Sequence, residues 1–318
     1  MHSAYGTRQL SIGEIFDRAI HITIANLLPL AAIVGLVDVP IRAIADWLDR
    51  AALSRSYGAY GKIVADPRLL ASFLTLTRDP HAHPFNWWTL LWTLVALFPL
   101  SLAVAAASIA SQEFLRGDTP KLGAVYRSAI GRLGPVIGAT MLALATYLVA
   151  ILAVVIALFI FWFVWLFIVA VAGGPANTVP VAGITAMMFF FFAAAMVWII
   201  PLTYCTTTGA ALNAIRPFLA WREAWAMTMV RGLRARSLAF GAALLALVLV
   251  QEFIRLAVCG FLLDVTHVPL ISFVISDAIS LLALLIGMAL AVVFYLDARN
   301  RVDLIQDPLA AQENSQAR

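Results

Sequence analysis

The sequence predicts an all-α polytopic membrane protein, with six transmembrane helices and three amphipathic elbow helices on the cytoplasmic side. Three observations lead to this prediction: the composition, a series of long apolar runs, and a short amphipathic segment that recurs before them. Of the 318 residues, 63% are hydrophobic and only 12% are charged, and the mean hydropathy is +0.95. A soluble domain is about half apolar and about one quarter charged. A transmembrane β-barrel would show short alternating segments instead, so both of these classes are excluded.

The first elbow unit covers residues 1–26 and contains a helix start signal. Ser11 and Glu14 have the spacing of a capping box, in which the Ser11 hydroxyl accepts from the Glu14 amide and the Glu14 carboxylate reaches back. The apolar residues of this unit recur at helical spacing; they are Ile12, Ile15, Phe16, Ala19 and Ile20. We therefore expect an amphipathic helix that lies in the membrane interface with this stripe facing the lipid.

Six apolar runs are each long enough to cross the hydrocarbon core, which takes about 20 helical residues. They cover approximately residues 27–47, 87–112, 137–172, 181–206, 238–262 and 270–296. The third run would measure about 54 Å as a helix, against a core of about 30 Å. No glycine, proline or charge between residues 140 and 171 offers a turn, so we expect one tilted helix that protrudes. The whole chain, residues 1–318, would then form a single membrane domain.

Lys and Arg residues set the expected orientation, because cytoplasmic segments carry an excess of them. The N-terminal segment, the segments after spans two and four, and the C-terminal tail 297–318 carry 2, 4, 5 and 3 of them. The turns 173–180 and 263–269 carry none. Both termini are therefore predicted to be cytoplasmic, in a bacterial inner membrane. The extracytoplasmic loop 48–86 carries five Lys or Arg residues and runs against this rule, but the other segments outweigh it.

The N-terminus and the cysteines agree with this topology. Residues 1–9 are polar and lead directly into the amphipathic segment, with no signal peptide, so we expect the first span to remain as an anchor. The two cysteines, Cys205 and Cys259, fall near opposite membrane faces. A disulfide needs Cα atoms within about 7 Å of each other, so none is predicted.

The stripe of the first elbow unit recurs twice, each time before a pair of spans. The second copy is Leu122, Val125, Tyr126, Ala129 and Ile130, and the third is Phe218, Trp221, Arg222, Trp225 and Ala226. Pro120 and Pro217 stand where the first turn of each helix would begin. The chain is therefore predicted to contain three copies of one unit, an elbow helix followed by a transmembrane hairpin. Arg222 interrupts the third stripe, and the alternative is that any surface helix before a span shows this pattern.

Three stretches carry a resemblance to a known family. They are LSIGEIFDRAI with the following NLLP, RPFLAWREAWAMTMVRG before the fifth span, and VFYLDARNRVDL after the sixth. In this order they resemble the bacterial glycerophosphoryl diester phosphodiesterase membrane-domain family, over most of the chain. The resemblance implies six helices and no individual site residues. The family takes its name from a soluble phosphodiesterase that is fused to some members. No soluble stretch here is long enough to hold that domain, so its activity is not implied.

Charged residues inside the spans are the strongest site signal, because a charge at mid-bilayer costs at least about 2.5–3.5 kcal/mol. The predicted intramembrane polar cluster consists of Asp38, Arg42, Glu252, Arg255 and Asp277. At about 1.5 Å per residue, all five fall in the outer half of the membrane. The spacing of Asp38 and Arg42, and that of Glu252 and Arg255, allows an ion pair within each helix. We expect Asp277 to reach across to Arg42 or Arg255.

Two interpretations of the polar cluster stay open. In the first, it lines a cavity that opens outward, for an anionic headgroup, an ion or a proton path, which is the usual reason for charges at this depth. In the second, it is a buried network that fixes which helices pack together.

A weaker candidate site lies in the extracytoplasmic loop. Asp79, His81 and His83 are metal-ligating residue types, and Pro80 and Pro84 favour the extended backbone that would aim both imidazole rings one way. No fourth ligand of the kind that zinc sites use is close in sequence, so we expect no metal.

The chain contains no G-x-S-x-G, Walker A or H-E-x-x-H motif. It is therefore predicted not to be an enzyme and to need no cofactor.

The leading functional hypothesis is a non-enzymatic inner-membrane protein that engages membrane lipid or a protein partner in the envelope. Nucleic acid is not expected as a partner, because the basic residues cluster beside the spans. The rival hypothesis is a small transporter or channel built around the polar cluster, and a third is a subunit without an activity of its own. An apolar groove open to lipid would favour the first, and a water-filled path from the charges to the cytoplasm would favour the second.

Overall fold

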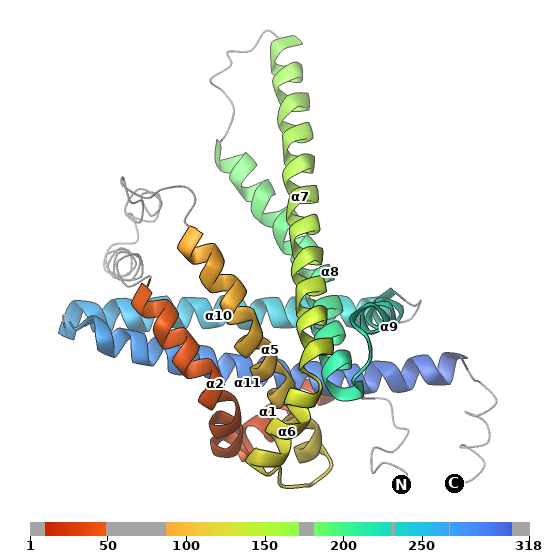
Figure 1. Ribbon diagram of the computed structural model, residues 1–318. Coiled ribbons are helices and arrows are strands. Elements are labelled where there is room, and N and C mark those ends of the chain that lie inside the picture. Colours follow the sequence, from red (N-terminus) through yellow and green to blue (C-terminus); the bar gives the residue numbers. More distant parts are fainter. Residues whose placement is uncertain (1–9, 49–86, 172–180, 230–232, 267, 307–318) are drawn as a thin grey trace.

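The computed structural model describes residues 10–48, 87–171, 181–229, 233–266 and 268–306 (Figure 1). Within these ranges almost every residue is helical and none lies in a strand. Six of the described helices are long and apolar enough to cross a membrane. The predicted fold class, an all-α protein with six candidate transmembrane helices, is therefore confirmed.

The long helices coincide with the six predicted spans. They are α2 (Leu27–Leu48), α5 (Trp87–Leu115), α7 (Leu133–Val171), α8 (Val181–Asn213), α10 (Arg234–Thr266) and α11 (Pro269–Gln306). The third span is one unbroken helix of 39 residues, as the absence of a helix breaker predicts. The largest difference is in α11, which does not stop at the predicted residue 296 but continues as a helix to Gln306.

A short helix precedes each pair of long ones, at the positions of the repeated unit. These helices are α1 (Ile12–Ala25), α6 (Leu122–Gly131) and α9 (Pro217–Met229). The predicted capping box starts α1: the Glu14 amide donates to the Ser11 hydroxyl oxygen at 3.2 Å, and the Ser11 amide donates to the Glu14 carboxylate at 2.6 Å. That these helices lie on the cytoplasmic face of the membrane stays a prediction.

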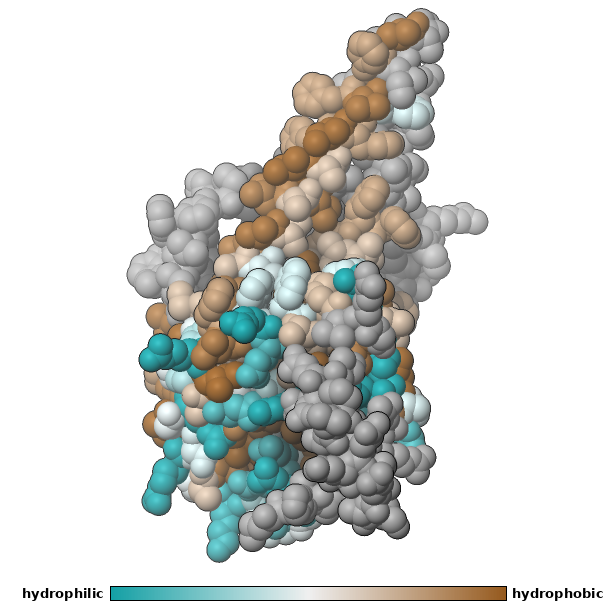
Figure 2. All heavy atoms as spheres, turned by 90° about the vertical axis from the view of Figure 1, so that its right-hand side faces the viewer, coloured by the Kyte–Doolittle hydropathy of each residue, from teal (hydrophilic) through white to brown (hydrophobic). Residues whose placement is uncertain are grey.

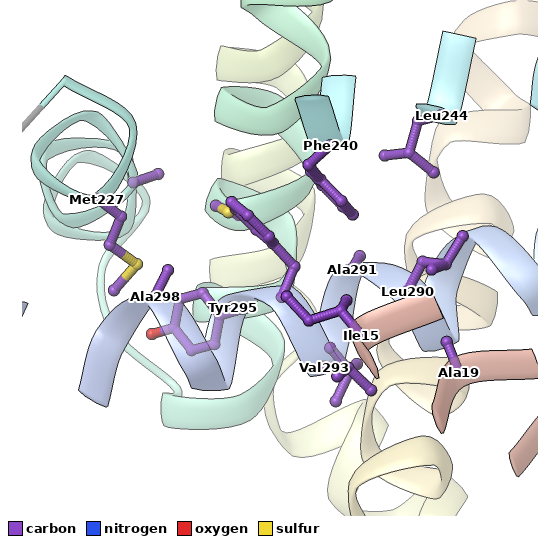
Figure 3. Packing of buried hydrophobic residues seen from close by; sticks show 14 of the residues in the cluster. Ile15, Ala19, Met227, Phe240, Leu244, Leu290, Ala291, Val293, Tyr295 and Ala298 are labelled. Carbon is purple, nitrogen blue, oxygen red and sulfur yellow. The ribbon is translucent and has the colours of Figure 1, made fainter. Parts of the chain in front are cut away.

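Part of the predicted apolar stripe of α1 is buried against protein, while Ile20 of that stripe is 42% exposed. Ile15 and Ala19 are buried in a cluster with Leu290 and Val293 of α11, and Figure 3 shows these side chains gathered between the two helices. Leu290 and Val293 lie within the predicted sixth span, so α1 covers part of the apolar run of α11 itself. Burial against protein supplies close contacts to more atoms than loosely ordered lipid does.

The face that α9 buries differs from the predicted stripe. Phe218, Arg222 and Trp225 of that stripe are exposed, and the rings of Phe218, Trp221 and Trp225 stack along the outside at 6.0 and 5.4 Å between centroids. The buried residues are Ala220, Ala224, Met227 and Thr228. Small side chains let helices approach closely, so α9 turns its alanine face to α8 and leaves its aromatic face outside. That the exposed aromatic face lies against lipid, as expected for an elbow helix, stays a prediction.

The three helix pairs diverge from a common centre. In Figure 1, α7 and α8 extend toward the top, α2 and α5 toward the upper left, and α10 and α11 run across the view to the left. Consecutive helices of each pair pack on one another. The ends of the hairpins that adjoin α1, α6 and α9 come together, and we call this region the base. The far ends of α7 and α8 lie well away from those of the other two hairpins in this view, while α2 also packs on α11.

Small residues form much of the base. In the described chain, the cluster around α5 contains Ala103, Ala105, Ala106, Ala107 and Ala110 together with residues of α2, α6, α7, α8 and α11. The second cluster joins α1, α8, α9, α10 and α11, and part of it is drawn in Figure 3. Within it the rings of Phe240 and Phe294 are stacked with their centroids 4.0 Å apart. Alanine-rich surfaces allow the close helix contacts that hold helices together in a lipid environment.

Beyond the base the helices expose large apolar side chains. On α7 no described residue after Ala143 is buried, and the exposed residues include Leu148, Val149, Phe159 and Phe163. Figure 2 shows this projecting part covered with hydrophobic side chains, while hydrophilic side chains gather at the other end of the molecule. Such a surface suits hydrocarbon and would be unfavourable in water.

Polar side chains of α6 and its C-terminal end connect the hairpins. The Tyr126 hydroxyl donates to the Ile33 carbonyl of α2, and burial raises the pKa of this phenol above its usual 10.0, so it stays a donor. Arg132 donates from Nη1 to the carbonyls of Ala211 and Leu212, at 2.7 and 2.9 Å. These carbonyls lie in the last turn of α8, where helical partners are missing.

Candidate functional site

Both ion pairs that the spacing of the polar cluster allows are present. In α2, Arg42 Nε donates to Asp38 Oδ2 at 2.6 Å; the side chain of Asp38 is buried and that of Arg42 is 32% exposed. In α10, Arg255 Nη2 donates to Glu252 Oε2 at 2.6 Å, and the Glu252 side chain is 40% exposed. Each helix therefore neutralises its own charges, with one member of each pair reaching the surface.

Contacts between helices show that these charges lie at one level. Gly35 of α2 lies against Leu281 of α11, and Gln251 of α10 donates to Ser280 Oγ of α11 at 3.4 Å. α2 and α10 run away from the base and α11 returns toward it (Figure 1). One helical turn further from the base therefore leads to Asp38 on α2, to Arg255 on α10 and to Asp277 on α11, while Glu252 directly follows Gln251.

Asp277 itself is partly buried on α11. Its expected link to Arg42 or Arg255 stays a prediction. Arg255 has a further feature: its Nε is buried and has no hydrogen-bond partner among the described residues. A charge exposed on a membrane span must meet water, a lipid headgroup or another protein group. The polar cluster therefore offers both a donor and a carboxylate acceptor to a polar ligand at this level.

The metal candidate Asp79, His81 and His83 lies outside the described residues, as does most of the loop 48–86. Within the described ranges, no group of three or more His, Cys, Asp or Glu side chains could hold a metal ion. Cys205 and Cys259 are both buried thiols. Cys259 donates to the Ser272 carbonyl at 3.2 Å, and the Ser272 hydroxyl donates to the Cys259 carbonyl at 3.1 Å, which fixes the outer part of the α10–α11 hairpin.

The best-connected charged group was not among the predicted site residues. The Asp297 side chain is only 5% exposed, and it accepts from Arg301 Nε at 2.8 Å, from Arg236 Nη2 at 3.1 Å and from the Leu10 amide at 3.0 Å. Both arginines also donate to the Leu10 carbonyl. We call this group the Asp297 knot. It joins the segment before α1 to the start of α10 and the end of α11.

A second network lies beside the knot in the base. Asn213 at the end of α8 donates from Nδ2 to the Tyr295 hydroxyl at 2.6 Å and accepts from Arg299 Nη1 at 2.9 Å. The Tyr295 hydroxyl donates to Glu223 Oε2 of α9 at 3.4 Å. This network joins three helices.

The sequence contained a signal for both networks. Tyr295, Asp297, Arg299 and Arg301 all lie in the stretch VFYLDARNRVDL, and Asp297 and Arg301 have the spacing of a helical ion pair. Tyr295 fell at the end of the predicted sixth span. Asp297, Arg299 and Arg301 follow that run, so they were assigned to a cytoplasmic tail and not to a helix packed in the base.

Comparison with known proteins gives no match for this chain, whether against family models, curated proteins or solved structures. The resemblance to the glycerophosphoryl diester phosphodiesterase membrane-domain family therefore stays a prediction.

Proposed function

We propose that this chain is a non-enzymatic integral protein of the bacterial inner membrane that engages membrane lipid, with both termini in the cytoplasm. The divergence of the three hairpins from a polar, closely packed base carries the proposal. Because the hairpins diverge, the apolar sides, or flanks, of their long helices are not covered by a neighbouring hairpin. These flanks include exposed residues of α2, α7 and α10, among them Leu36, Leu148, Leu249 and Phe253.

Acyl chains are the natural occupants of these flanks. No hydrophobic force closes a gap between apolar helices in a bilayer, because lipid tails are as apolar as leucine. The hairpins are held apart by contacts in the base, where the two hydrogen-bond networks lie. Lipid between them would be bounded on both sides by protein. The exposed ends of the ion pairs, Arg42 and Glu252, are suited to meet the polar part of such a lipid.

Lipid mass spectrometry of the purified protein tests this proposal. We expect protein exchanged through a mild detergent to retain phospholipid in a fixed ratio to protein, because chains held between two hairpins leave more slowly than lipid on a single convex surface. A monodisperse protein that loses all of its lipid in the same washes would contradict the proposal. Retention of a copurifying envelope protein in place of lipid would contradict it as well, and would favour the protein-partner hypothesis.

A second candidate function is a small transporter or channel. The observation that favours it is the single level at which three helices carry charges, with the carboxylate of Glu252 exposed. For a conducting path, we expect Glu252→Gln and Asp277→Asn to abolish ion or proton flux in proteoliposomes while the protein stays monodisperse. Asp17→Asn, on the exposed side of α1, is the matched control and should leave the flux unchanged. Equal flux in all three variants would rule this function out.

A further inference from the structure

A depression lies where α9 ends and α10 begins, beside the middle of α8. It encloses about 210 Å³, counting space that is open to the outside. The depression is shallow and open on one side, so it can hold only a part of a larger molecule. Its lining residues on α8 and α10 belong to candidate membrane spans, which places it at the edge of a bilayer.

One wall of the depression is apolar. It is formed by Val197, Trp198 and Pro201 of α8 and Leu238 of α10. Trp198 is 44% exposed, and indole rings prefer the boundary between hydrocarbon and headgroups. This wall could therefore lie along the first part of an acyl chain.

The other wall is cationic and polar, and Arg234 is its charged residue. Arg234 is exposed, and its Nε donates to the Met229 carbonyl at the end of α9 at 2.7 Å. No other hydrogen bond joins this guanidinium to the described residues. The group has five N–H donors, and guanidinium groups bind phosphate through two parallel hydrogen bonds.

Two further features of this wall favour an anion. Arg234 is the first residue of α10, a helix of 33 residues, and the start of a helix attracts negative charge through its free amides and its dipole. Ser237, in the first turn, lines the depression and is 4% exposed. Its hydroxyl has no hydrogen-bond partner among the described residues. A buried hydroxyl without a partner is costly, and a ligand oxygen would supply one.

From these observations we propose that the depression binds the headgroup of an anionic phospholipid. Arg234, Ser237 and the start of α10 hold the phosphate, and the wall of Trp198 and Leu238 lies along the acyl chain. This inference rests on the proposed lipid-engaging function and names the class of lipid and the place where it binds.

The test uses the full-length protein in detergent, titrated with phosphatidylglycerol and followed by native mass spectrometry. We expect Arg234→Gln to raise the dissociation constant about tenfold, the effect of losing a charge-assisted contact. Glutamine keeps an N–H donor for the Met229 carbonyl, so the junction of α9 and α10 is preserved. Arg222→Gln removes the same charge from an exposed position on α9 and should bind like the unchanged protein.

A second pair of variants tests the apolar wall without touching a charge. Trp198→Ala should weaken phosphatidylglycerol binding, whereas Trp162→Ala on α7 should not; the two tryptophans are 44% and 39% exposed, so both substitutions should be tolerated. Equal binding by Arg234→Gln and Arg222→Gln, or by the two tryptophan variants, would overturn the site. Equal affinity for phosphatidylcholine, or displacement of the lipid by inorganic phosphate, would overturn the assigned ligand class.

The outcomes also separate this inference from the proposed function. If the unchanged protein retains lipid and Arg234→Gln retains the same amount, only the site in the depression fails. If the unchanged protein retains no lipid, both proposals fail.

Discussion

Replacing Asp297 with alanine should lower the free energy of unfolding by about 3–5 kcal/mol, the usual cost of removing one partner from a buried ion pair. The variant keeps two arginines in the base without their counter-charge, since the side chains of Arg236 and Arg301 are only 19% and 12% exposed. It also leaves the Leu10 amide without the acceptor that it has in the knot. Both losses occur in a region shielded from water, where an unpaired charge is most costly.

Denaturation of the purified protein with sodium dodecyl sulfate, starting from a mild detergent, measures this change. Asp17→Ala is the matched control, because Asp17 lies on the exposed side of α1, and it should unfold like the unchanged protein. Asp297→Asn keeps an acceptor of the same shape and should fall between the two. If Asp297→Ala and Asp17→Ala unfold at the same denaturant concentration, the knot does not hold the base together.

The second large effect is expected for Gly241→Ala. At this residue α10 crosses α8 so closely that an added Cβ would overlap the carbonyl group of Val197. Overpacking of a core typically costs about 1–3 kcal/mol, and we expect the upper end of that range. The obstacle is the backbone of a neighbouring helix, which cannot turn aside as a flexible side chain can. The better helix propensity of alanine returns at most about 1 kcal/mol.

Gly134→Ala in α7 provides the control for this substitution. Nothing lies within 4 Å of the position where its Cβ would be, so only the propensity gain remains and the variant should be slightly more stable than the unchanged protein. The same denaturation experiment compares the two. Equal stability of both alanine variants would show that α8 and α10 do not cross at Gly241.

The secondary structure of this protein could be read from local sequence. Runs of apolar residues give the six long helices, because length and composition alone decide whether a helix can cross hydrocarbon. The capping box at Ser11 and the unbroken course of α7 also depend on residues near in sequence. Within α2 and α10 the spacing of opposite charges was sufficient to predict the ion pairs.

The packing of the helices on one another could not be predicted from local sequence. Apolar stripes were assigned to lipid, but Ile15 lies against α11, whose helix continues beyond its apolar run. In α9 the stripe gave no sign of the face that packs on protein, which is formed by small residues such as Ala220 and Ala224. A stripe shows which residues avoid water, and both protein and lipid satisfy that requirement.

A better signal was present in the distribution of small residues. Alanines and serines are concentrated in the second half of α5, where Ala103, Ala106 and Ala110 are buried, and large branched and aromatic residues fill the exposed far part of α7. In a bilayer, close packing favours small side chains and does not follow from hydrophobicity. This contrast marks where the hairpins meet and where they separate. It does not reveal the Asp297 knot, whose partners come from three distant parts of the chain.

The knot has a consequence for biosynthesis. The hydrogen bond from Leu10 to Asp297 joins residues 287 positions apart, so α1 can dock only after α11 has been made. Contacts of such long range form late. Until then the face of α1 that contains Ile15 has no surface of α11 to pack against. An amphipathic helix in that state can lie in the headgroup region of the bilayer. The membrane-surface location of α1 that the sequence predicts would then be its location in the nascent chain. Its location against α11 would be that of the completed protein.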